Sequence, residues 1–281
     1  MPVKKIRLEP TASLVMRMAE PLYRRGKIKR YFSRLDLSSG EALLEQCSQI
    51  CAWYAQVILN RKHYISGNVR DYIRRNKKPV QIIIPAAGKT PLGMELVLNK
   101  RLRIASVFET DITGMREKKR LAAELFPEIS GRIHFFKADI SKYGWEKIIF
   151  RHRAYKPERP SLIILEGISY YLPPASLLKT IACFKTQNRS NAVMFEYKIP
   201  DENVSSERRA IPRAVFGAIR KDCKTALTAY TRKQLTGMLE SVGAEILSAA
   251  DMARMEKLRT GKNRFFKRSA DGWIECIFFK I

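Results

Sequence analysis

The chain has 281 residues, of which 46% are hydrophobic and 10% aromatic, so its composition excludes a disordered, collagen-like or low-complexity protein. Lysine and arginine outnumber aspartate and glutamate by 53 to 27, which gives a formal net charge of +26 at pH 7. A charge of this size attracts anionic partners of any kind. The composition therefore allows several kinds of partner: nucleic acid, acidic proteins, anionic lipid, and carboxylate or phosphate substrates.

Three features of the sequence bear on where the protein acts. No apolar run approaches the roughly 18 residues that a membrane-spanning helix needs. The basic residues at the start are not followed by the apolar core of a secretory signal. The five cysteines form no disulfide pattern, and Cys47 and Cys51 have no neighbouring histidine that would complete a metal site. We therefore expect a cytoplasmic protein with no membrane span and no metal ion.

The first 78 residues favour helices. Apolar residues recur every three or four positions, without the alternation of a strand, over residues 12–23, 40–60 and 67–74. Basic residues outnumber acidic ones in this part, most densely over residues 24–30. We predict that residues 1–78 form a helical lid over a second unit, residues 79–281.

From residue 79 onward, short apolar runs alternate with helical segments. Strands are expected over residues 79–84, 103–108, 132–136, 161–165 and 191–197, and helices over residues 92–99, 115–125, 143–150 and 174–185. Strands that are separated by helices and joined by right-handed crossovers form a mostly parallel, doubly wound sheet. The fold class is therefore α/β.

The last part of the chain does not continue this regular alternation of strands and helices. A helix is expected over residues 231–242, with Thr231 at its N-cap, followed by a short strand over 244–247 and a terminal strand over 273–279. The remaining segments, residues 201–230 and 254–271, have the pattern of surface loops or insertions.

Ligands of an open parallel sheet bind beyond the carboxyl ends of its strands, so the residues that follow each strand are the candidates for a site. The first strand leads into a turn of small residues around Gly88, which lets a ligand approach backbone N–H groups. This turn is not a nucleotide P-loop, because the first glycine of that motif would fall at Ile83. After the second strand, Asp111 lies 23 positions beyond Gly88, near the spacing at which an acid reaches a ribose; an N-cap for the next helix is the alternative.

The third and fourth strands also end in acidic residues. Asp139 and Ile140 follow the third strand, where a carboxylate can accept from an exocyclic amine while isoleucine packs on a ring, although the pair would equally suit a turn. Glu166 follows the fourth strand, with Tyr170 and Tyr171 close behind it. An acid that emerges from a buried strand is costly unless a ligand or partner satisfies it.

These segments resemble a known family. The run Glu166-Gly167-x-x-x-Tyr171-Leu172-Pro173 resembles the E-G-x-x-x-Y-L-P segment of the leucine carboxyl methyltransferase family, which includes bacterial O-methyltransferases of the polyketide type. Phe108-Glu109-Thr110-Asp111, with Lys118 downstream, is similar to the family's F-E-x-D and lysine, and Tyr230-Thr231 through Gly243 resembles a later helix. The resemblance covers about residues 79–250. It implies a class I methyltransferase that uses S-adenosylmethionine and releases S-adenosylhomocysteine, with a Rossmann-like sheet, a reversed last strand and an N-terminal helical lid.

The resemblance also implies roles for individual residues. Gly88 would lie under the methionine part of the cofactor, Asp111 with Glu109 would bind the ribose, Asp139 and Ile140 would frame the adenine, Glu166 would approach the methionine amine, and Arg70 would be the lid arginine that holds the methionine carboxylate. The first loop departs from the family's L-G-A-G-x-D-T, because Ala86 replaces its first glycine and Thr90 its aspartate. We expect Asp111, Asp139 and Glu166 to converge on one adenosyl-sized crevice.

The substrate is less constrained by the sequence. Methyl transfer is an in-line displacement that mainly requires positioning in a dry pocket, and a carboxylate acceptor needs no general base. Lys198, Arg208 and Arg213 are candidates to seat an anion, or belong to the general positive surface, and Tyr170 and Tyr171 line the methyl site or pack the lid. The sequence therefore favours O-methylation of a carboxylate or hydroxyl, on an anionic small molecule or on a metabolite bound to an acidic carrier protein.

Two other functions remain open. The basic clusters fit an RNA methyltransferase or a basic RNA-binding protein, although the sequence contains no recognisable RNA-binding module. The altered first loop fits a methyltransferase-like protein without catalysis.

Overall fold

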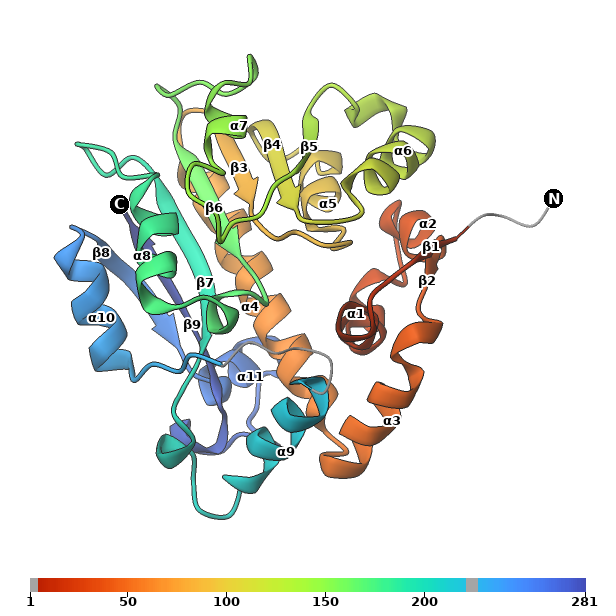
Figure 1. Ribbon diagram of the computed structural model, residues 1–281, viewed down its shortest axis with the longest axis vertical. Helices are drawn as coiled ribbons and strands as arrows, with labels where there is room; N and C mark the ends of the chain where they lie inside the picture. Colours follow the sequence, from red (N-terminus) through yellow and green to blue (C-terminus); the bar gives the residue numbers. More distant parts are fainter. Residues whose placement is uncertain (1–4, 221–226) are drawn as a thin grey trace.

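A computed structural model describes residues 5–220 and 227–281 of the chain (Figure 1). Its centre is a sheet of seven strands in the order β5-β4-β3-β6-β7-β9-β8. The strands are β3 (Val80–Ile84), β4 (Ile104–Asp111), β5 (Ile133–Lys137), β6 (Ser161–Leu165), β7 (Ala192–Lys198), β8 (Glu245–Ala250) and β9 (Ile274–Lys280). The pairs from β5 to β7 are parallel, and β9 runs antiparallel to both β7 and β8. The predicted fold class, with its reversed last strand, is confirmed.

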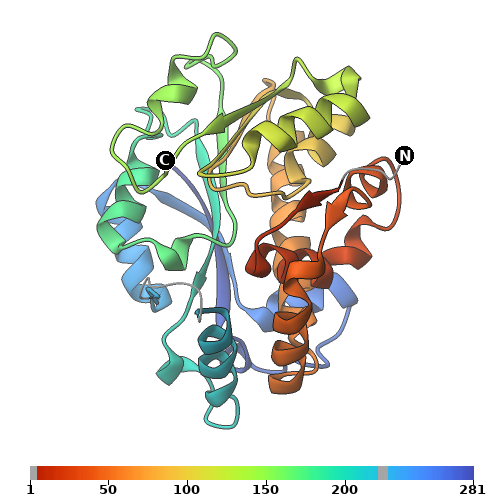
Figure 2. The same cartoon turned by 45° about the vertical axis from the view of Figure 1, so that its right-hand side comes forward.

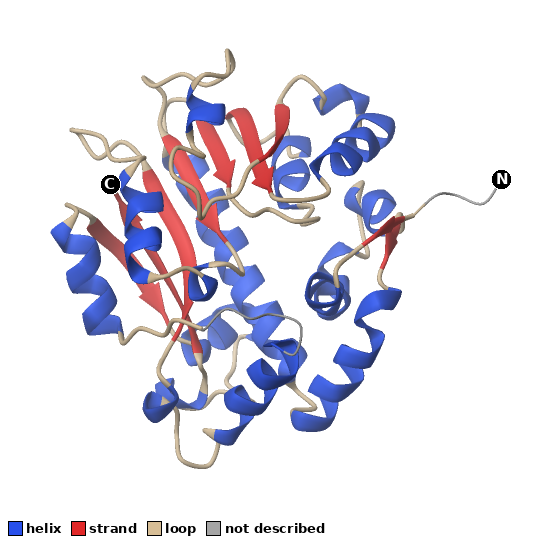
Figure 3. Ribbon diagram, in the orientation of Figure 1, coloured by secondary structure: helices blue, strands red, loops and turns tan. Residues whose placement is uncertain are grey.

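Helices cover both faces of this sheet. Figure 2 views the sheet close to its edge, with α8 (Pro174–Ala182) and α10 (Arg232–Ser241) on one side and α4 (Tyr54–Arg75) and α11 (Met252–Thr260) on the other. The other helices are α1 (Pro10–Tyr23), α2 (Ile28–Phe32), α3 (Glu41–Ile50), α5 (Leu92–Leu98), α6 (Met115–Leu125), α7 (Lys147–Phe150) and α9 (Ala210–Ile219). Figure 3 shows the alternation of helices and strands that the sequence predicts.

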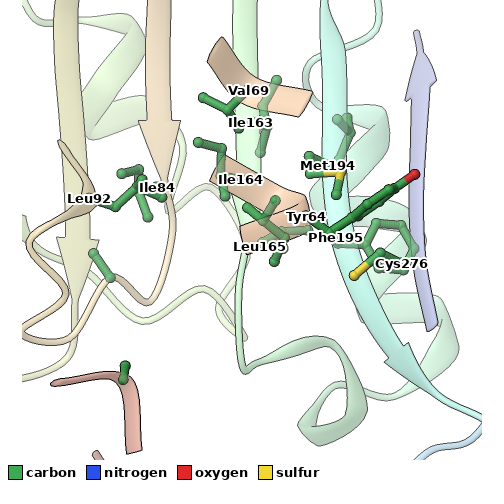
Figure 4. Packing of buried hydrophobic residues seen from close by; sticks show 14 of the residues in the cluster. Tyr64, Val69, Ile84, Leu92, Ile163, Ile164, Leu165, Met194, Phe195 and Cys276 are labelled. Carbon is green, nitrogen blue, oxygen red and sulfur yellow. The ribbon is translucent and has the colours of Figure 1, made fainter. Parts of the chain in front are cut away.

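The core lies where α4 crosses the central strands. All five residues of β6 and all seven of β7 are buried, as expected for strands that are covered on both faces. Figure 4 shows Tyr64 and Val69 of α4 beside Ile164 of β6 and Phe195 of β7. Because α1 and α11 also pack on α4, this one helix connects the N-terminal helices to the sheet.

The N-terminal part differs from its prediction in detail. The helix expected over residues 40–60 is interrupted at residues 51–53, which separate α3 from α4, and the helix expected over 67–74 is the last part of α4. Two short strands, β1 (Ile6–Arg7) and β2 (Leu35–Asp36), pair in parallel and were not expected. The division of the chain after residue 78 stays a prediction.

Two predicted loops contain helices. Residues 201–230 include α9, whose apolar face is buried, and residues 254–271 include most of α11, which begins at an Asp251 N-cap. Residues 221–226 of the first segment lie outside the described residues. The helix expected over 231–242 is confirmed as α10, and Thr231 forms a capping box with Gln234.

Gly93, at the start of α5, faces a buried ion pair. A Cβ at this position would lie 2.3 Å from the Glu109 carboxylate and 2.9 Å from Val107. Glu109 in turn pairs with Lys118 of α6 at 2.5 Å, and both side chains are fully buried. Neither partner can move away without leaving a charge unpaired, so the site has no room for a methyl group.

We therefore predict that Gly93→Ala lowers the free energy of unfolding by about 1–3 kcal/mol, the usual cost of overpacking a buried site. Gly237→Ala in α10 is the matched control, because a Cβ there would meet no atom within 4 Å. Since alanine is the better helix former, the control should keep or raise stability. Urea unfolding of both variants measures the difference, and equal stabilities would contradict this account.

Candidate functional site

The candidate site lies at the carboxyl edge of the sheet. The ends of β3, β4, β5 and β6 meet there because these strands are parallel and adjacent. The loop after β3, Asp111 at the end of β4, Asp139 after β5 and Glu166 after β6 thus lie along one edge, and their convergence on one crevice stays a prediction. In Figure 1 the helices α1 and α2 lie beyond this edge.

The loop after β3 is fastened to the end of β4. The Gly88 N–H donates to Asp111 Oδ2 at 2.8 Å, and Ala87 N–H donates to the Thr110 carbonyl at 2.9 Å. Ala86 and Gly88 both have a φ of 50°, in the left-handed region that glycine adopts most easily. Ala86 therefore adopts a backbone conformation that favours glycine, at the cost of some strain.

The acidic residues predicted for the ribose and adenine are placed at neighbouring strand ends. Asp111 accepts from Gly88 N–H and Thr113 N–H, which leaves other lone pairs of its carboxylate open. Asp139 accepts from the Ser141 N–H and hydroxyl, and these two hydrogen bonds hold its pKa below the ordinary value. Ile140 beside it is buried.

Glu109 differs from its expected place beside the ribose. Its side chain has no exposed surface and pairs with Lys118 behind the loop. Burial raises the pKa of Glu109 despite the attraction of Lys118, and burial lowers the pKa of Lys118 despite the attraction of Glu109. Lys118 also donates to the Gly88 carbonyl at 3.1 Å, so the pair supports the loop from below rather than facing a ligand.

Glu166 meets two cations of α4 that were not among the predicted site residues. Lys62 Nζ lies 2.5 Å from Glu166 Oε1, and Arg61 Nη2 lies 3.9 Å from the same oxygen. Burial raises the pKa of Glu166, but the attraction of Lys62 and Arg61 outweighs burial, so its pKa lies below the ordinary value. Glu166 is therefore a carboxylate held ionised by the two side chains.

A second buried acid, Glu196 of β7, completes this group of charges. Arg61 forms an ion pair with Glu196 Oε1, which also accepts from Gly167 N–H at 2.9 Å and lies 3.4 Å from the Tyr170 hydroxyl. Burial, followed by the neighbouring Glu166, raises the pKa of Glu196 against the attraction of Arg61. We call Arg61, Lys62, Glu166 and Glu196 the charge cluster.

The sequence pattern of α4 does indicate that Arg61 is buried and needs a partner. Val57, Arg61, Ile65 and Val69 recur every four residues in α4, and all four are buried. An arginine on an otherwise apolar helix stripe needs a buried partner, which Glu196 supplies. Glu196 itself interrupts the apolar run of β7, but its partner could not be identified before the two elements were placed together.

The charge cluster borders two cavities. The larger, of about 220 Å³, is lined by α1, by Arg61 and Lys62, by the loop after β3, and by Glu166, Tyr170 and Tyr171. The smaller, of about 180 Å³, is lined by Tyr23, His63, Arg70 and Glu95, and shares only Lys62 and Glu166 with the larger. The ion pair Lys62–Glu166 therefore separates the two cavities.

Several expected residues lie elsewhere. Arg70 reaches the smaller cavity, but its guanidinium pairs with Glu95. Asp111, Asp139 and Ile140 line neither cavity. The aromatic pair Tyr170 and Tyr171 does line the larger one, with ring centroids 4.9 Å apart.

The three cations expected to seat a substrate line neither cavity, and their role at the substrate stays a prediction. Lys198 and Arg213 both pair with Asp201, at 2.6 and 3.1 Å. Arg208 stacks over the Trp53 ring at 4.9 Å and donates to the Asp271 carbonyl. The partners of these three cations are thus Asp201 and the Trp53 ring. The sequence alone could not identify these partners.

Two residues that line the larger cavity have buried polar atoms without partners. Arg61 Nε and Thr90 Oγ1 are buried and have no hydrogen-bond partner among the described residues. Buried polar groups without partners are costly, so their presence in a cavity wall is typical of a ligand site. In the described part of the chain there is no group of three metal-ligating side chains, nor a helix long and apolar enough to cross a membrane.

Removing Arg61 should show how much a buried carboxylate destabilises the fold when it has no partner. We predict that Arg61→Met, which leaves Glu196 buried and unpaired, lowers the free energy of unfolding at pH 7 by about 3–5 kcal/mol. The folded-state pKa of Glu196 then lies well above its unfolded value, so the folded state binds more protons and the variant regains stability as the pH falls from 7 to 5. Urea unfolding at the two pH values measures this.

The double variant Arg61→Met/Glu196→Gln is the control for this prediction. It removes the unpaired charge and should recover a large part of the lost stability at pH 7. A loss below about 1 kcal/mol for Arg61→Met, the range of a solvent-exposed ion pair, would contradict a buried cluster.

A family model matches the sequence, and several solved structures have a similar fold. The model of the leucine carboxyl methyltransferase family matches residues 17–185. A methyltransferase candidate from Thermobifida fusca has a similar structure, with a TM-score of 0.67 and 13% identity over 97% of this chain and 95% of that one. A DUF574 family protein from Streptomyces avermitilis follows, with a TM-score of 0.63 and 10% identity over 94% and 96% of the two chains.

A third solved structure contains ligands. The geranyl diphosphate C-methyltransferase of Streptomyces coelicolor, in complex with Mg²⁺, geranyl-S-thiolodiphosphate and S-adenosylhomocysteine, is similar with a TM-score of 0.50 and 8% identity over 97% of this chain and 99% of that one. No protein of curated function matches the sequence.

Proposed function

Because the chain belongs to the leucine carboxyl methyltransferase family, we propose that it is an S-adenosylmethionine-dependent methyltransferase that methylates a carboxylate oxygen of a small or carrier-bound molecule. The observation that carries this proposal is the charge cluster at the end of β6, where two cations of α4 meet a carboxylate between two cavities.

The residues at this edge fit the cofactor. S-adenosylmethionine, when bound, supplies the methyl group on a sulfonium. Asp111 has lone pairs for a ribose diol, Glu166 is held ionised and suits an ammonium group, and Lys62 and Arg61 suit a carboxylate. We assign the methionine carboxylate to Arg61 and Lys62 because both line the larger cavity beside the loop after β3, whereas Arg70 lines only the smaller one.

The walls of the larger cavity favour a substrate that needs no base. Burial, first of all, raises the pKa of Tyr170 well above its ordinary value, so this hydroxyl keeps its proton. His63 lines only the smaller cavity, where burial and nearby arginines lower its pKa. A carboxylate acceptor is ionised at neutral pH and can attack directly, whereas a hydroxyl would require a base at the reacting atom.

The chain's own residues then act by positioning and by excluding water. Tyr170 and Tyr171 line the cavity together with Glu166 and are its aromatic side chains, the kind of group that attracts a sulfonium. Helix α1 closes the other side of the cavity, and α2 is tied to the loop after β3 by the Tyr31 hydroxyl, which donates to the Lys89 carbonyl at 3.1 Å. We propose that residues 5–78 act as the lid of this site.

A carrier-bound substrate would meet a basic surface beside the lid. Arg24, Arg25, Lys27, Lys29 and Arg30 are all exposed around α2, and their field would steer an acidic carrier toward the site. We place the reaction in the cytoplasm, since the described cysteines Cys47, Cys51, Cys183 and Cys276 are all free thiols.

Cofactor binding can be tested without a known substrate. Isothermal titration calorimetry should show binding of S-adenosylmethionine and S-adenosylhomocysteine, and Asp111→Asn should weaken it by about 10-fold or more, because a charge-assisted hydrogen bond to the ribose is lost. Asparagine can still accept from Gly88 N–H, so the loop is preserved. Glu124→Gln, which removes an exposed carboxylate of α6, is the control and should bind as the natural protein does. Failure of the natural protein to bind either compound would instead favour an inactive methyltransferase-like protein.

The position of the methyl group can be read from the chemistry of the product. Incubation with a methyl-labelled cofactor and a mixture of small organic acids should give a product that releases labelled methanol in mild base, as methyl esters do. Methyl ethers and C-methyl products are stable under those conditions. A label that withstands base would contradict carboxylate methylation while leaving the cofactor assignment intact.

A further inference from the structure

A wide hollow lies at the edge of the sheet opposite the candidate site. It has a volume of about 1070 Å³ and is bordered by the end of α4 and by the loops that lead into β3, β6 and β7. In Figure 1 this is the edge near the mark of the C-terminus. We call it the amino-edge groove.

Five cations line the amino-edge groove from separate parts of the chain. They are Arg75, Lys77, Lys78, Arg189 and Lys280. None of these five has a carboxylate within ion-pair distance among the described residues. Two carboxylates also line the groove: Asp71, which pairs with Arg74, and Glu158. The groove is therefore positive, with cations whose charges are not neutralised.

The rest of the lining is polar in a way that suits phosphates and sugars. It supplies amides, Asn68, Asn76, Gln187 and Asn188, and hydroxyls, Thr186, Ser190 and Ser248. These side-chain types, with arginine and lysine, make most protein contacts to nucleic-acid backbones. Its aromatic rings, Tyr72 and Phe278, are buried, and of its large apolar side chains only Leu247 is exposed, at 40%. A protein partner would need an apolar interface core, which this groove does not offer.

The shape of the groove suits a polymer rather than a single anion. A second hollow of about 410 Å³ shares Thr186, Gln187 and Arg189 with it and adds Lys185, so the positive surface continues past Arg189. Arg189 has a φ of 49°, in the left-handed region that arginine rarely adopts. Its loop is held by Thr186, whose hydroxyl accepts from Ser190 N–H at 2.9 Å and donates to the Ile281 carbonyl at 3.1 Å. Strained residues held in this way are typical of binding sites.

We propose that the amino-edge groove binds the phosphodiester backbone of a nucleic acid. The lack of exposed rings for base stacking implies little preference for sequence. Because the groove lies at the opposite edge of the sheet from the methyl-transfer site, the nucleic acid acts as a docking partner and not as the methyl acceptor. The proposal does not depend on the proposed function.

Fluorescence anisotropy with a labelled 20-nucleotide RNA, and with a DNA of the same sequence, tests this proposal. The test variant is Lys77→Gln/Lys78→Gln/Arg189→Asn, in which asparagine tolerates the left-handed backbone at residue 189. The control variant, Arg116→Gln/Lys119→Gln/Arg120→Gln, removes the same charge from exposed residues of α6 that line no described cavity. Circular dichroism and S-adenosylhomocysteine titration check that both variants are folded.

The natural protein is expected to bind, with an affinity that falls steeply as salt rises. The groove variant should bind about 10-fold or more weakly, and its slope of log affinity against log salt should shrink by about 2, as expected for the loss of three single-strand phosphate contacts. The control should change by less than about 3-fold. Equal losses in the two variants would mean that only net charge matters and would overturn the proposal. Absence of binding to RNA and DNA, or binding only to an acidic polypeptide such as polyglutamate, would overturn it as well.

Tighter binding of the RNA or of the DNA would show which nucleic acid the groove binds, since only RNA offers 2′-hydroxyls to the amides of the groove. The S-adenosylhomocysteine titration separates this result from the proposed function. A protein that binds the cofactor but no nucleic acid overturns only the groove, and the reverse result overturns only the methyltransferase assignment.

Discussion

The structure depends on how α4 brings two cations into the interior beside the sheet. Arg61 and Lys62 are 4% and 6% exposed, and desolvation at that depth would be prohibitive without the carboxylates of Glu196 and Glu166. The attraction of these partners keeps the pKa values of Arg61 and Lys62 above their ordinary values although burial alone would lower them. Because α4 also carries α1 and α11, these ion pairs fix the position of the N-terminal helices relative to the strand ends.

The same charges give the site its chemistry. An amino-acid group carries one ammonium and one carboxylate, the same two charge types as the Lys62–Glu166 pair that separates the two cavities. A ligand with that group can replace each partner of the pair by a like charge, so the cluster stays neutralised while the pair opens. The Arg61–Glu196 pair, which lies deeper, holds α4 in place during such an exchange. In the proposed exchange, Arg61 would keep its Nη1 on Glu196, while its Nη2 and the adjacent Lys62 would contact the ligand carboxylate.

Much of the fold could be predicted because its signals are local. Apolar runs such as residues 161–165, the 3.6-residue period of residues 115–125 and the Thr231 cap determine their elements within a few residues. The loop predictions over α9 and α11 were wrong for two reasons. Helix α9 contains Pro212 and Gly217, which disfavour a helix in the sequence pattern, and α11 carries basic residues between its buried Met252 and Met255 and its end. The site was predicted only in part for a related reason. The positions of Gly88, Asp111 and Glu166 could be predicted because each follows the end of a strand. The site roles of Arg61, Lys62 and Glu196 could be recognised only once α4 was placed across β6 and β7. The sequence could not show that Lys198 and Arg213 pair with Asp201, because this acid lies in a turn that no pattern places.

The central claim is that Arg61, Lys62 and Glu166 recognise the amino-acid end of the cofactor. Its most direct test compares the dissociation constants of S-adenosylhomocysteine and methylthioadenosine, which share the adenosine and sulfur but differ in that end. The account predicts that methylthioadenosine binds about 100-fold more weakly, because two charge-assisted interactions are absent. Equal affinities would show that the cations of α4 serve the fold alone.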